Sequence, residues 1–136
     1  MNKKPQIDDY LTKIAFETVG EFQLSTQWLT AGTVACALRC ETEKIYTGIC
    51  IDLACGLGFC AEHSAVASML KDRETRVLEI VAVTQDNIIP PCGRCREMLL
   101  QINTENKNTL VTVQNNIAVT LCELMPFHWM ESYKKT

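Results

Sequence analysis

Apolar residues recur at helical spacing near the start of the chain, where they share one face of a helix. They are Ile7, Leu11, Ile14, Ala15 and Val19. This period of three to four residues predicts an amphipathic helix, which Gly20 would end.

Two later segments show the same period. Residues 61–71 predict a second helix, whose inward-facing positions are Ala61, Ala65, Met69 and either Ala67 or Ser68. The segment "PPCGRCREMLLQI" predicts a third helix, with an apolar stripe formed by Cys95, Met98, Leu99 and Ile102. Both helices begin at a segment that contains cysteine.

Five segments rich in β-branched and apolar residues predict strands, at about 33–40, 44–52, 77–85, 109–114 and 117–124. The first two are joined by Glu41–Glu43, as in a hairpin, and "LACGLGF" predicts a loop. Strands that alternate with helices predict a mixed five-stranded sheet with helices on both faces. The expected fold is therefore a three-layer α/β/α sandwich, built by residues 1–136 as a single domain.

Composition and charge exclude several classes of function. The chain of 136 residues is 47% hydrophobic and 21% charged, as in soluble globular proteins. Its net charge is −3 and no run of Lys or Arg exceeds two residues, which argues against a nucleic-acid partner. No apolar stretch approaches the ~20 residues of a membrane span. The polar N-terminus lacks the apolar core of a secretory signal, so we expect a cytoplasmic protein.

Eight cysteines are many for this length. Because a cytosol keeps thiols reduced, no disulfide framework is expected. Cys36, Cys50 and Cys122 lie in apolar, strand-like runs and are expected to fill the core. Cys40 lies at a strand end and Cys55 in a loop. The three that remain stand where a helix begins: Cys60, Cys92 and Cys95.

These three cysteines predict a zinc site. Successive strand–helix units bring helix N-termini to one edge of a sheet, and a helix N-terminus lowers the pKa of a thiol. Cys92 and Cys95 form the C-x-x-C pair that commonly binds zinc. No second C-x-x-C pair exists, and a zinc site with three protein ligands keeps a position for water. The pattern therefore favours a catalytic site over a structural one.

Glu62 follows Cys60 by two residues, which suits a general base beside that water and then a general acid. Other interpretations remain open at this point. Glu62 could only stabilise the first turn of its helix, and the cysteines could be inert core thiols or a redox pair.

The combination "CAEHSAVASM" and "PPCGRCREML" resembles the cytidine deaminase superfamily, whose pattern is His/Cys-x-Glu and then Pro-Cys-x-x-Cys. The resemblance extends from about Thr33 to Trp129. It implies zinc-dependent hydrolytic deamination of a cytosine nucleoside, with cytidine or deoxycytidine as the first choice and a role in pyrimidine salvage. It further implies one Zn²⁺ per chain held by the three cysteines, with Glu62 as the proton carrier. A homotetramer whose neighbouring subunits contribute to each pocket is also implied.

Two departures from the family pattern concern charge and substrate. "PCGRCR" is closer to enzymes of the blasticidin-S-deaminase type, which makes deamination of such an antibiotic the alternative function. Zn²⁺ with three thiolates is net negative, so a nearby cation would favour ionisation of the water. Many relatives carry an arginine directly after the glutamate, where this chain has His63. We expect Arg94 to supply that cation, in preference to Arg96.

Candidate substrate contacts are Cys50, Asp52, Ala61, Phe127 and Trp129. Cys50 and Asp52 stand where similar nucleoside deaminases show Asn and Glu, but a thiol is a poor substitute for an amide. Asp52 either accepts from a sugar hydroxyl or is a solvated acid at a strand end. Phe127 or Trp129 either stacks on a base or fills the core.

A function of another class, a non-catalytic structural zinc module, would need a fourth ligand and a basic face. The sequence offers neither.

Overall fold

The computed structural model describes residues 9–133, so Ile7 of the first expected helix lies outside the described part. In chain order its elements are α1 (Asp9–Thr18), β1 (Phe22–Gln23), β2 (Thr30–Cys40), β3 (Ile45–Asp52), α2 (Ala61–Lys71), β4 (Val77–Val83), β5 (Ile88–Ile89), α3 (Gly93–Ile102), the 3₁₀ helix η1 (Thr104–Asn108), β6 (Leu110–Gln114), β7 (Ile117–Thr120) and the 3₁₀ helices η2 (Leu121–Leu124) and η3 (Trp129–Tyr133). None of the helices in residues 9–133 is long and apolar enough to cross a membrane.

The sheet is mixed, as expected, but it contains seven strands where the sequence predicted five. The longer strands pair in the order β3-β2-β4-β6-β7, and only β4 and β6 among these described pairs run parallel. β1 and β5 are the additional strands, and each has two residues, too few to show a periodic pattern. The fifth expected strand ends at Thr120, because residues 121–124 turn into η2.

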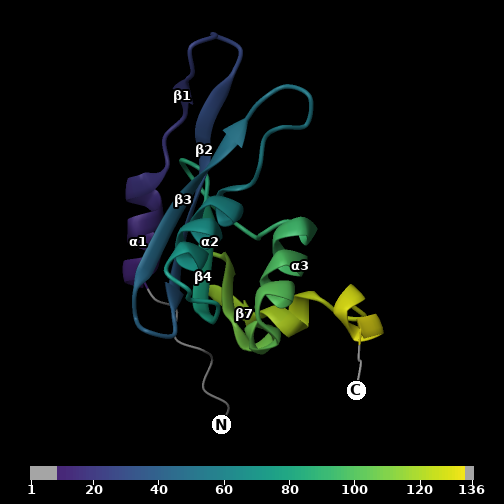
Figure 1. Cartoon of the computed structure of the whole chain (residues 1–136). Coiled ribbons are helices and arrows are strands. Elements are labelled where there is room, and N and C mark those ends of the chain that lie inside the picture. The colour runs from purple at the N-terminus through teal and green to yellow at the C-terminus, as the bar shows by residue number, and fades with distance from the viewer. Residues whose placement is uncertain (1–8, 134–136) are drawn as a thin grey trace.

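Helices cover both faces of the sheet, which confirms the three-layer α/β/α arrangement (Figure 1). Side chains of β2 alternate between the two faces, as they do in any strand. Ala35 and Ala37 pack in one cluster with Leu11 of α1. Leu38, between them and the strand end, packs in the other cluster with Met69 of α2. The sheet therefore carries one apolar core on each side.

Burial along the helices corrects two details of the sequence analysis. Ala67 and Ser68 are exposed, and Val66 takes the inward position that was expected for one of them. Cys122 is exposed instead of buried, because it lies in η2 after the strand has ended. Cys36, Cys40 and Cys50 are buried in the core.

The backbone of α2 lies directly against β3 at Gly48. A Cβ atom at Gly48 would stand 2.3 Å from the backbone nitrogen of Ala65 and 2.8 Å from the carbonyl oxygen of Ala61. Any side chain larger than hydrogen would therefore push the helix away from the sheet. This close approach fixes the position of α2 along β3, so that the helix begins beside the end of the strand.

We expect Gly48→Ala to lower the free energy of unfolding by about 1–3 kcal/mol or more, because the added methyl group overlaps backbone atoms that have little room to move. Urea denaturation measures this change. The matched control is Gly20→Ala, where a Cβ meets nothing within 4 Å. Equal stability of the two variants would contradict the close contact.

Candidate active site

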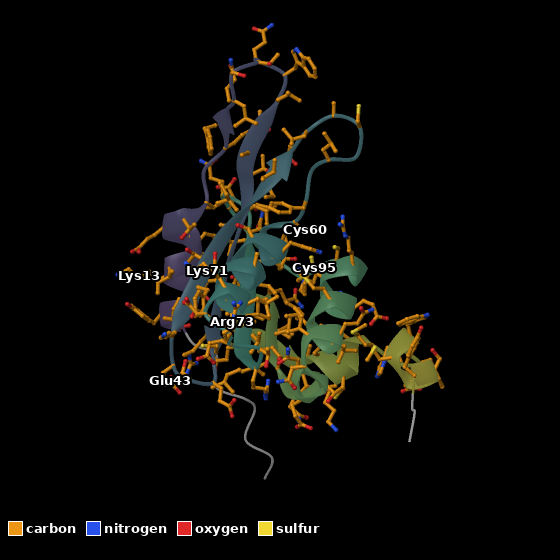
Figure 2. All side chains as sticks on the ribbon, viewed as in Figure 1. Lys13, Glu43, Cys60, Lys71, Arg73 and Cys95 are labelled. Carbon is orange, nitrogen blue, oxygen red and sulfur yellow. The ribbon has the colours of Figure 1, made fainter. Side chains whose placement is uncertain are left out.

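The N-termini of α2 and α3 meet and bring Cys60, Cys92 and Cys95 together. Cys60 directly precedes α2, Cys92 directly precedes α3, and Cys95 lies in the first turn of α3. The Sγ atoms of Cys60 and Cys92 are 3.6 Å apart, as are those of Cys92 and Cys95. Figure 2 shows Cys60 and Cys95 close together at these helix ends.

The spacing of the sulfurs fits a tetrahedral zinc ion. With Zn–S bonds of about 2.3 Å, two thiolates of one tetrahedron lie roughly 3.8 Å apart. All three sulfurs lie within 4.8 Å of one another, and no other group of three potential ligands occurs in residues 9–133. The donor set is therefore three soft thiols with no fourth side chain, which suits zinc and leaves one coordination position for a small molecule.

The three thiols differ in how readily they ionise. Burial raises the pKa of Cys60, and burial together with the adjoining Glu62 carboxylate raises the pKa of Cys95. Burial also opposes ionisation of Cys92, but backbone N–H groups of Cys95 and Arg94 and the neighbouring thiols outweigh it, so the pKa of Cys92 is lowered. The start of α3 thus favours the thiolate at Cys92.

Glu62 is the second residue of α2, which places its side chain beside the cysteine cluster. Its side chain is buried, at 4% exposure, and its carboxylate contacts the Cys95 thiol. Cys36, behind it in the core, has a raised pKa because of its burial and of the charge on Glu62. A carboxylate at the surface could interact with the helix dipole without the free-energy cost of burial. The burial of Glu62 therefore indicates a role beyond stabilising the helix.

A cavity of about 620 Å³ opens beside the sulfurs. Its walls hold most of the residues that the sequence analysis selected: Cys50, Asp52, Cys60, Ala61, Glu62, Cys92 and Arg94. Cys95 is fully buried behind them. The strand end, the two helix starts and the thiols therefore face one space.

Phe127 and Trp129 are not among the residues that line this cavity. Phe127 is 94% exposed, and Trp129 packs on Tyr133 with 4.4 Å between ring centroids. The backbone N–H of Trp129 donates to Glu97 at 3.2 Å. Within the described chain, neither ring is placed to stack on a base.

The candidate cations lie as follows. Arg94 is exposed at the rim of the cavity, and in residues 9–133 its guanidinium donates no hydrogen bond to a sulfur. Arg96 turns away, donating to the carbonyl oxygens of Pro91 at 2.8 Å and Leu124 at 3.3 Å. His63 is the basic side chain that touches a sulfur of the cluster in residues 9–133: its Nδ1 lies 3.5 Å from Sγ of Cys95. Burial and the charge of Arg94 lower the pKa of His63.

The sequence analysis placed His63 where many relatives carry an arginine and assigned the cation near the sulfurs to Arg94, so it did not predict the contact between His63 and Cys95. It also missed Thr33, which lines the cavity and bonds to Cys50 and Asp52. Nothing in the local pattern of a strand indicates which residue turns toward a cavity.

Comparisons with known proteins agree with this geometry. The family model described as the cytidine and deoxycytidylate deaminase zinc-binding region matches residues 5–111. The fold is similar to crystal structures of cytidine deaminases from Mycobacterium tuberculosis (23% identity, TM-score 0.75, covering 91% of this chain and 98% of that one) and Mycobacterium leprae (22%, 0.73, 87% and 96%). It is also similar to the cytidine deaminase from Bacillus anthracis (23%, 0.68, 92% and 88%).

We expect the purified protein to hold about one zinc ion per chain, and Cys92→Ser to lower that content well below one, because a hydroxyl is a far poorer zinc ligand than a thiolate. Metal analysis after gel filtration measures this. Cys122→Ser is the control, since Cys122 is exposed and lies outside the cluster. A wild-type protein without zinc, or a fully loaded Cys92→Ser variant, would refute the ligand set.

Proposed function

Because the chain belongs to the cytidine and deoxycytidylate deaminase zinc-binding family, we propose that it hydrolyses the exocyclic amine of a cytosine nucleoside, cytidine or deoxycytidine. The observation that carries the proposal is the shared cavity, whose wall holds the buried Glu62 beside Cys60 and Cys92. A metal-binding cluster and a proton-transferring carboxylate that face one space have the parts that hydrolytic deamination needs.

The reaction replaces the amine at C4 of cytosine with oxygen. A zinc ion held by Cys60, Cys92 and Cys95 would act as a Lewis acid and lower the pKa of water at the site. Glu62 takes a proton from the attacking water, whose oxygen bonds to C4, and delivers that proton to N3. Glu62 then carries the remaining hydroxyl proton to the amine. The C4–N bond breaks, ammonia leaves, and C4 becomes a carbonyl.

Burial suits Glu62 for both steps. A carboxylate that is 4% exposed loses most of its contact with bulk water, so it exchanges protons with what occupies the cavity. The neighbouring Cys95 thiol contacts the carboxylate and helps to hold its position. Its attachment to a helix that packs on the sheet places the carboxylate beside the cysteines.

The cavity suits a small molecule. Its volume of about 620 Å³ lies within the ~300–1,000 Å³ that is usual for small-molecule sites. The net charge of −3 disfavours a polynucleotide, whose phosphates would be repelled. A free nucleoside therefore fits better than a nucleic acid strand.

The proposal includes a homotetramer. Phe127 and Trp129 lie outside the cavity of their own chain and are exposed by 94% and 52%. In the proposed assembly they would contact substrate only in the pocket of a neighbouring subunit. Arg94, at the rim, would act on the thiolates through its charge without bonding to them.

We expect Glu62→Gln to reduce ammonia release from cytidine by ~10²-fold or more, because an amide transfers no proton. Zinc content, measured in the same sample, should stay unchanged. The matched control is Glu17→Gln, an acid-to-amide change at an exposed position of α1. Undiminished ammonia release by folded Glu62→Gln protein would refute this role.

A substrate panel tests the choice of base. We expect ultraviolet absorbance to report turnover of cytidine or deoxycytidine in preference to cytosine, blasticidin S and guanine. Preferred turnover of blasticidin S would point to the antibiotic-deaminase alternative. Turnover of guanine alone would contradict the cytosine assignment while leaving the metal chemistry intact.

A further inference from the structure

Strand β2 contains a bulge beside the cavity. Ala31 pairs with Ile51 of β3 and Ala35 pairs with Ile49, so residues 32–34 lie opposite Cys50 alone. Gly32 permits this bend, because its φ of +88° is a conformation that side chains disfavour, and a Cβ there would stand 2.2 Å from the carbonyl oxygen of Gly20. Bulges next to active sites commonly redirect one side chain, and here that residue is Thr33.

The Cys50 sulfur is hydrogen-bonded to residues of this bulge. The backbone N–H of Val34 donates to Sγ of Cys50 at 3.2 Å, and the Thr33 hydroxyl lies 3.0 Å from the same sulfur. Cys50 is only 6% exposed. The thiol thus completes the hydrogen bonding of the bulge and supports its neighbours, which leaves it little capacity to contact a ligand.

Thr33 also holds Asp52. Its hydroxyl donates to Oδ2 of Asp52 at 3.1 Å, and the Cys50 thiol lies 3.6 Å from the same oxygen. In residues 9–133 the other carboxylate oxygen of Asp52 accepts no hydrogen bond, and no Lys, Arg or His forms an ion pair with this side chain. Residues of β2 and β3 therefore orient the Asp52 carboxylate, while one of its oxygens stays available to a ligand in the cavity.

The charges that line the cavity are mostly negative. Asp52 and Glu62 face it with their carboxyl groups, and Arg94 is the one cation among its described lining residues. Three thiolates leave a bound Zn²⁺ net negative as well. An anionic group such as a phosphate is therefore repelled at the Asp52 wall, and a cationic group is attracted.

We propose that Thr33 and Asp52 form a recognition site for a positively charged group, a primary ammonium, on the part of the nucleoside away from the base. The inference rests on the proposed function, which places the cytosine ring at Glu62. The rest of the substrate then extends along the strand wall of the same cavity. Asp52 binds the ammonium, and Thr33 is a positioning residue that fixes the Asp52 carboxylate.

Binding is tested in zinc-loaded Glu62→Gln protein by calorimetry at neutral pH, where turnover does not interfere. The ligands are cytidine, 3′-amino-3′-deoxycytidine, 5′-amino-5′-deoxycytidine and cytidine 5′-monophosphate. We expect at least one amino nucleoside to bind about threefold tighter than cytidine or better, which is the scale of a partly exposed ion pair, and the monophosphate to bind more weakly than cytidine. Rising ionic strength should reduce the preference for the amine.

Further substitutions in the Glu62→Gln protein show which residues cause the preference for the amine. Asp52→Asn should abolish the preference for the amine, and Thr33→Val should reduce it, while Thr33→Ser, which keeps the hydroxyl, restores it. Glu17→Gln removes one negative charge far from the cavity and should leave the preference intact. The salt dependence needs no change in the site, so it stays informative if Asp52→Asn fails to fold.

The proposal is overturned if neither amino nucleoside binds tighter than cytidine, or if their advantage persists in Asp52→Asn or at high salt. Protein with Glu62 intact separates this failure from that of the proposed function. Ammonia release from cytidine, together with no tighter binding of the amino nucleosides, would refute only the recognition site. No ammonia from cytidine or either amino nucleoside would refute the deaminase assignment itself.

Discussion

The contact between α2 and β3 at Gly48 is the constraint on which the rest of the site depends. The helix backbone lies so close to the strand that a Cβ would stand 2.3 Å from the nitrogen of Ala65. This contact sets where α2 begins, and with it the positions of Cys60 and Glu62. Because α3 begins beside the same edge, a small displacement of α2 would separate the sulfurs. Shape complementarity in the core therefore controls the spacing of the sulfurs.

The two helix starts create an environment in which unlike groups coexist. Burial opposes ionisation of all three thiols, yet backbone N–H groups at the start of α3 lower the pKa of Cys92. Burial and the contact with the Glu62 carboxylate raise the pKa of the Cys95 thiol, so a nearby cation would favour its thiolate form. A divalent metal supplies that charge. A bound metal would therefore stabilise the cysteine cluster and the carboxylate beside it together.

The strand side of the cavity is organised by different means. There a bulge centred on Gly32 turns Thr33 toward Cys50 and Asp52, and the Cys50 sulfur accepts the N–H that the bulge leaves without a strand partner. The cysteine cluster and Glu62 thus come from the helix starts, whereas Thr33, Cys50 and Asp52 come from the strands.

The sequence by itself determined the helices, the five longer strands, the three-layer fold and the cluster of Cys60, Cys92 and Cys95, because periodicity and residue type encode each of them locally. It overlooked β1 and β5, and it expected Cys122 in the core, since a strand of two residues or an early strand end leaves no periodic signal. Only the tertiary structure decided that His63 rather than Arg94 touches a sulfur, and that Thr33 meets Asp52. Such contacts join residues from different elements, so they depend on how helices and strands pack and not on any stretch of sequence alone.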